Sequence, residues 1–105
     1  MQRVGVTFSA YAEETAQEAI DLALAVGLLD IEVYVFVERG ALPHLFPADR
    51  ETLGRWRTLI DLCPARIFVD QDTNWAGAQP EFTIEAVSTA ERQRLKQSCD
   101  RLIQG

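Results

Sequence analysis

Four polar side chains stand where apolar segments of the sequence end, and they are the residues best placed for chemistry. If these segments are parallel strands of one sheet, their carboxyl ends meet at one edge, and such sheets bind ligands at that edge. The sequence therefore predicts a candidate ligand-binding site there. Its members, in chain order, are Ser9, Tyr11, Glu38 and Asp70.

The chemistry open to these side chains is limited by what surrounds them in the sequence. A nucleophilic Ser9 needs a base to take its proton, but the single histidine, His44, lies in another predicted loop and there is no GxSxG turn. Asp70 and Asp72 could bind Mg²⁺, or one of them could act as an acid. Phosphoryl chemistry also needs a glycine loop that holds phosphate, and the sequence has none. Serine hydrolase and metal-dependent phosphoryl chemistry are therefore both disfavoured.

Two of the four candidates, Ser9 and Glu38, also have a purely structural explanation. Ser9 can mark the entry to a helix, and Glu38 can belong to a solvated turn in which Gly40 takes a positive φ angle. Both interpretations stay open at this point.

The two cysteines are expected to be inert. Cys63 and Cys99 lie far apart in the sequence and in no CxxC or metal-ligand spacing. Cys63 precedes a predicted strand, which places it at the amino end of the sheet, and neither cysteine begins a helix that would activate a thiol. With one histidine in the chain, a histidine-based metal site is not expected. We predict no metal and no cofactor.

The loop over residues 41–47 carries apolar side chains beside its histidine. His44 could transfer protons, but its apolar neighbours favour packing. Such side chains either fold back under the loop or lie in a contact between subunits. We expect a subunit contact formed by Leu42, His44, Leu45 and Phe46.

Strands and helices alternate along the chain, which indicates a mostly parallel sheet. Short segments rich in β-branched residues predict strands at residues 3–8, 31–37, 65–69 and 82–87. Apolar residues at steps of three and four predict helices over residues 13–27 and 48–62. In the tail, periodicity slightly favours one helix over residues 88–104, and the alternative is a helix ending near Ser98 followed by a short strand at 101–104.

Length and charge set the broad class. The 105 residues, of which 48% are hydrophobic, suit a single domain spanning 1–105. A net charge of −6 argues against nucleic acid and anionic membranes as partners. No apolar run approaches the ~20 residues that cross a bilayer, and no signal peptide is evident, so a cytoplasmic location is expected.

Several segments of the chain have a familiar pattern. Apolar strands are predicted at 4–9 and 33–37, and an acidic-glycine-apolar turn follows the second of them at 38–42. These segments resemble the start of DsrF/TusC-type proteins. The segments at 67–72 and 82–85 and the closing 99–103 are similar to later parts of the same DsrE/DsrF/DsrH (TusD/TusC/TusB) superfamily of sulfur-relay proteins. The likeness covers nearly the whole chain.

The resemblance implies a three-layer α/β/α, flavodoxin-like (DsrE-like) fold and a role in a homo-oligomer or a hetero-oligomer with DsrE/TusD-type subunits. It also implies a short final strand, so we expect residues 101–104 to be extended at the sheet edge. DsrE/TusD-type members carry a persulfide on a cysteine at the end of the third strand, ahead of an Arg-Gly pair. Here that place falls at about Val69, and the pair is Ala76-Gly77. Whether the chain is an enzyme stays open.

Two functions follow from these observations. In the first, the chain is a non-catalytic subunit or paralogue in a sulfur-relay complex, and the absent thiol favours this interpretation. In the second, it is a stand-alone small α/β protein with a ligand or an enzyme role at the carboxyl edge of the sheet.

Overall fold

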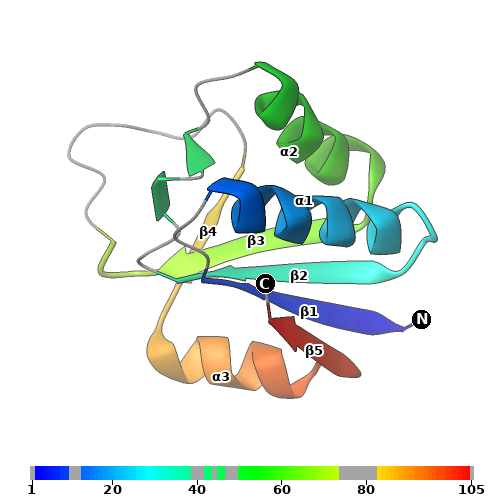
Figure 1. The fold of residues 1–105 in the computed structure, drawn as a ribbon. Coiled ribbons are helices and arrows are strands. Elements are labelled where there is room, and N and C mark those ends of the chain that lie inside the picture. The colour runs from blue at the N-terminus through cyan, green and yellow to red at the C-terminus, as the bar shows by residue number, and fades with distance from the viewer. Residues whose placement is uncertain are drawn as a thin grey trace.

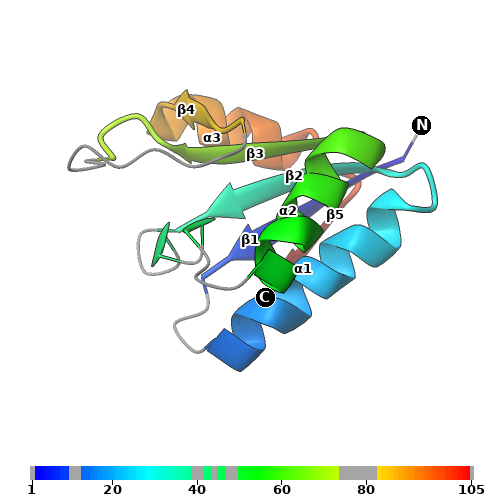
Figure 2. The same cartoon turned by 90° about the horizontal axis from the view of Figure 1, so that it is seen from above.

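The computed structural model describes residues 2–9, 13–38, 42–43, 45–46, 50–73 and 83–104. They form a five-stranded, all-parallel sheet in the order β4-β3-β2-β1-β5. Helices α1 and α2 cover one face of the sheet and α3 covers the other (Figures 1 and 2). This confirms the three-layer α/β/α, flavodoxin-like fold. The elements are β1 (Arg3–Phe8), α1 (Glu13–Gly27), β2 (Glu32–Val37), α2 (Arg50–Leu62), β3 (Ala65–Asp70), β4 (Glu85–Val87), α3 (Thr89–Gln97) and β5 (Arg101–Gln104).

Residues 88–104 form a helix followed by a short strand, the second of the two predictions made for this segment. The continuous helix that periodicity favoured is wrong, because α3 ends at Gln97 and β5 pairs with β1 at the sheet edge. Asp100 fixes this change of direction, since its Oδ2 accepts a hydrogen bond from the Arg3 backbone N–H at 2.7 Å. The expected edge strand at 101–104 is thus confirmed.

The fourth strand is shorter than predicted. The sequence predicted a strand over 82–87, but β4 covers only Glu85–Val87 and pairs with the last three residues of β3. Thr83 and Ile84 lie outside it, and Phe82 lies outside the described residues. An edge strand has a partner on one side only, so β-branched composition alone does not extend it.

The larger core lies between the sheet and the pair α1 and α2. It is built from the inward side chains of β1, β2 and β3, together with Trp56 and Leu59 of α2. Trp56 is 1% exposed and its ring meets Phe8 edge-on, with centroids 5.6 Å apart. Alternate residues of these strands are therefore buried against α1 and α2.

The second core, under α3, is thinner. Its buried members are Tyr34, Phe36, Phe68 and Val87, and α3 itself contributes no buried residue. The rings of Phe36 and Phe68 stack at 5.4 Å. Because apolar contact beneath α3 is limited, polar contacts must contribute to holding this helix on the sheet.

Within the described ranges, every helix falls short of the length and apolar character that a bilayer-crossing segment needs.

Candidate functional site

The carboxyl edge of the sheet brings two of the four predicted site residues together. Asp70 ends β3 and Glu38 follows β2, and the pairing of Phe36 with Phe68 places them side by side. Arg92 of α3 lies between them. Its Nη1 donates to Glu38 Oε2 at 3.2 Å, and its Nη2 contacts Asp70 Oδ1. Lys96 Nζ lies 3.7 Å from Glu38 Oε1.

Arg92 is the most enclosed charge of this cluster. Its side chain is 11% exposed, against 35% for Glu38 and 25% for Asp70. Nη2 contacts the Asp70 carboxylate without hydrogen-bond alignment, and the buried Nε has no hydrogen-bond partner among the described residues. Two cations thus face two carboxylates. Such an arrangement neutralises the carboxylates and ties α3 to the sheet, which suits a structural contact better than a proton-transfer site.

The other two predicted site residues are placed only in part. Ser9 follows Phe8, whose carbonyl oxygen accepts a hydrogen bond from the Glu38 N–H at 2.9 Å, so Ser9 lies at the same edge of the sheet. Tyr11 lies outside the described residues. A site formed by all four residues therefore stays a prediction.

Both cysteines lie at the opposite edge, where the strands begin. Cys63 comes just before β3, is 7% exposed, and has its pKa raised by burial and by the nearby Asp30 carboxylate. Cys99 comes just before β5 and its Sγ donates to the Leu95 carbonyl at 3.4 Å. Burial raises its pKa too, although Arg3 opposes the shift. Neither thiol has the exposed, electropositive setting of a nucleophile.

The segment predicted to form a subunit contact divides into buried and exposed residues. Leu45 is 1% exposed in the main core, and the half-buried Leu42 packs against that core. For these two, folding back into the chain is what the structure shows. Phe46 stays 39% exposed, and His44 lies outside the described residues. The subunit contact itself remains a prediction, now carried by Phe46.

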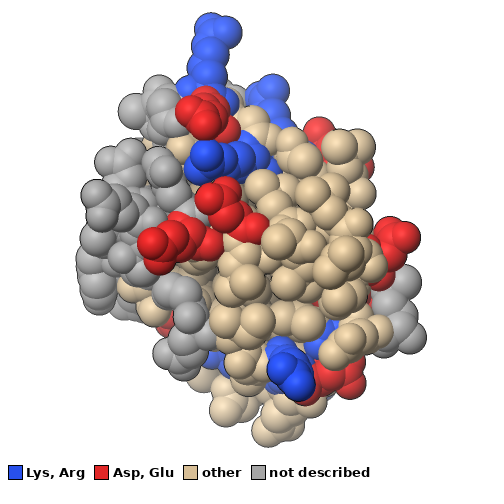
Figure 3. Space-filling model, turned by 45° about the vertical axis from the view of Figure 1, so that its right-hand side comes forward, with Lys and Arg blue, Asp and Glu red and all other residues tan. Residues whose placement is uncertain are grey.

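Sequence reasoning missed an exposed group of leucines, named here the leucine patch: Leu28, Leu29 and Leu62. These side chains are 63%, 72% and 73% exposed. Gly27 packs against Cys63, since a Cβ atom built at Gly27 would lie only 2.8 Å from the Cβ atom of Cys63. The three leucines are the sequence neighbours of these two residues. Figure 3 shows a broad uncharged area on this side of the molecule, with charged residues around it. Exposed apolar groups of this kind mark interaction surfaces.

An open groove of about 480 Å³ beside the strand beginnings has its charges already paired. Arg66 donates to both carboxylate oxygens of Glu85, at 2.8 and 2.6 Å, which lowers the pKa of that carboxyl. Arg3 donates to Glu32 at 2.6 Å and lies over the Tyr34 ring. These pairs leave little charge for a ligand. No cluster of three or more potential metal ligands occurs among the residues that the structure describes.

Comparison with known proteins identifies the fold. The chain superposes on the crystal structure of the ychN protein from E. coli with a TM-score of 0.80, covering 100% of both chains at 11% sequence identity. No family model and no curated protein matches the sequence. The likeness shows that the two chains share their fold.

Position 69, where the resemblance places the persulfide cysteine, holds a buried side chain that cannot carry sulfur. Val69 is 1% exposed and belongs to the core between the sheet and α1 and α2. The next residue, Asp70, is the one that reaches the edge, and it is in contact with Arg92. The end of the third strand therefore carries an ion pair and no thiol.

Proposed function

We propose that this chain is a non-catalytic subunit, or a paralogue of one, in a cytoplasmic sulfur-relay complex of the DsrEFH/TusBCD kind. The observation that carries the proposal is the end of β3 in a DsrE-like fold. There, a buried valine and the Glu38–Arg92–Asp70 cluster stand where a persulfide cysteine is expected. The chain would support intracellular sulfur transfer while a DsrE/TusD-type partner supplies the thiol.

The chemistry of the edge is consistent with this division of roles. Sulfur transfer requires a thiolate that attacks and a site that stabilises the persulfide. Both thiols of this chain lie at the other edge and have raised pKa values, so little thiolate forms near neutral pH. The carboxylates of Glu38 and Asp70 are neutralised by cations, which also disfavours the alternative of a ligand site there.

Two apolar surfaces support a role in assembly. Phe46 lies beyond the carboxyl end of β2, and the leucine patch lies at the other end of the strands. We propose that both are buried in a homo-oligomer or in a hetero-oligomer with DsrE/TusD-type subunits. In a chain with a net charge of −6, uncharged surfaces are where close approach of another acidic subunit costs least.

Assembly is tested by producing the chain alone and together with a DsrE/TusD-type subunit from the same genome. We expect light scattering to give a mass above that of a monomer in at least the mixed sample. Phe46→Ala and the double variant Leu28→Ser/Leu62→Ser should each weaken association about tenfold or more, because buried apolar anchors dominate such contacts.

Stability separates this effect from misfolding. Leu28 and Leu62 are mostly exposed, so the double variant should keep the free energy of unfolding within about 1 kcal/mol of the original. A chain that stays monomeric at high concentration, and also in the presence of the partner, contradicts the proposal.

A further inference from the structure

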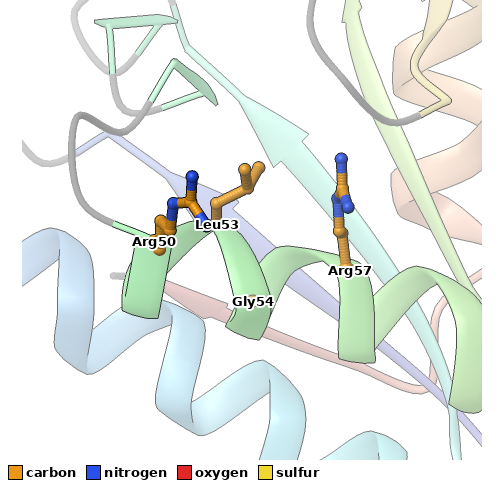
Figure 4. Close-up of a pocket in the computed structure, with 4 residues that line it drawn as sticks. All are labelled: Arg50, Leu53, Gly54 and Arg57. Carbon is orange, nitrogen blue, oxygen red and sulfur yellow. The ribbon is translucent and has the colours of Figure 1, made fainter.

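A groove beside α2 is lined by two arginines and has a glycine, which carries no side chain, between them. It has a volume of about 340 Å³ and is lined by Arg50, Leu53, Gly54 and Arg57. Figure 4 shows the side chains of Arg50, Leu53 and Arg57 projecting to the same side of the helix, with Gly54 between the two arginines. None of the residues named for the sheet edges or for the assembly surfaces is among those that line this groove.

Helix geometry explains why these four residues share a face. Successive residues turn by about 100°, so positions 50, 53, 54 and 57 fall within an arc of about 100°. The buried Leu59 lies on the opposite side of the helix, the buried Trp56 lies about 110° from the centre of the arc, and Arg55 turns toward α1, where its Nε lies 3.5 Å from Asp21 Oδ1. The two groove arginines are thus on the solvent side, about 10 Å apart along the axis.

Gly54 has no packing reason to be glycine. A Cβ added there would have nothing within 4 Å, and the residue lies in the middle of a helix, where glycine is less favourable than alanine. Because Gly54 has no side chain, the helix backbone is exposed between the guanidinium groups of Arg50 and Arg57. A group of a ligand can therefore approach the helix closely at that point.

The balance of nearby charge is positive. Glu51 is engaged by Arg55 at 3.1 Å, and Asp61 lies one turn beyond Arg57. Arg57 also takes part in another interaction within the chain, so a bound anion would share that side chain. The groove is a basic site on a chain whose net charge is −6.

We propose that this groove binds a phosphate-bearing small molecule, with one phosphate group over Gly54 held between Arg50 and Arg57. Guanidinium groups donate two parallel hydrogen bonds to phosphate oxygens, and two such groups on one face form a clamp. The half-buried Leu53 offers an apolar wall for the rest of the ligand. The inference does not depend on the proposed function.

The test is an NMR titration of the whole chain with pyrophosphate and, separately, with ADP. We expect saturable shifts confined to amides of α2 around residues 50–57 with at least one of the two probes. Arg50→Gln and Arg57→Gln should each weaken binding about tenfold, as expected for loss of a charge-assisted hydrogen-bonding group. Arg101→Gln is the matched control, because it removes the same charge from an exposed position on β5 and should change affinity less than twofold.

Gly54→Ala separates binding from stability. The added methyl group meets nothing within 4 Å in the free chain, so the variant should unfold at a higher denaturant concentration than the original. It should nevertheless bind several-fold more weakly, since the methyl group fills the floor. No saturable binding of either probe, an equal loss in Arg101→Gln, or undiminished binding by Gly54→Ala would overturn the proposal.

Discussion

Replacing Arg92 with methionine lowers the free energy of unfolding by about 3 kcal/mol. The side chain is 11% exposed and its guanidinium contacts both Glu38 and Asp70, so its removal takes the cation from between two partly buried carboxylates and leaves only Lys96 Nζ, 3.7 Å from Glu38. In a domain of this size that loss corresponds to a fall of roughly 10–20 °C in melting temperature. Denaturant titration and calorimetry measure both quantities.

Arg94→Met provides the control for this prediction. Arg94 lies on the same helix, is exposed, and is not part of the cluster, so the variant should change stability by less than about 0.5 kcal/mol. Hydrogen exchange should also show faster opening of α3 in the Arg92 variant. Equal stabilities of the two variants would show that the cluster contributes nothing to the attachment of α3.

Replacing Phe68 with alanine costs about 3–5 kcal/mol of unfolding free energy. Phe68 is fully buried, stacks on Phe36, and meets the Tyr34 ring edge-on at 5.1 Å. Because the core under α3 has so few buried members, the cavity has little apolar material to close around it. We expect α3 and β5 to lose protection from hydrogen exchange before the α1 and α2 layer does.

Phe46→Ala is the comparison for the same chemical change at an exposed position. Phe46 is 39% exposed, so its truncation in the single chain should cost about 1 kcal/mol or less. If Phe68→Ala cost no more than this, the aromatic cluster would not be the support of α3 that the geometry indicates.

The sequence predicted the fold well where each segment had one dominant signal. The boundaries of β1 and α1 match the prediction, since β-branched alternation in one and apolar spacing in the other are unopposed. The tail was different. Leu95 and Leu102 fit a single helical face, yet the contact of Asp100 with the start of β1 turns the chain into a strand, and periodicity carries no information on such a contact.

The two carboxylates of the candidate site, Glu38 and Asp70, could be predicted from the sequence, but the two cations that contact them, Arg92 and Lys96, could not. Glu38 and Asp70 follow strands, so topology alone places them together. Arg92 comes from a helix rich in charged residues, where nothing in the sequence distinguishes a partly buried arginine from the exposed Arg94 beside it. Leu45 was uncertain for a similar reason, because an apolar loop residue has the same appearance whether it packs inward or against a partner.

Mass spectrometry after exposure of the native chain to a persulfide donor tests the central claim most directly. We predict that neither Cys63 nor Cys99 retains a sulfur atom, because Cys63 is buried, Cys99 is only partly exposed and burial raises the pKa of both thiols, whereas the unfolded chain reacts at both. A persulfidated DsrE/TusD-type partner mixed with this chain should keep its sulfur. Rapid, stoichiometric labelling of Cys63 in the native chain, with transfer abolished by Cys63→Ser, would contradict a non-catalytic role.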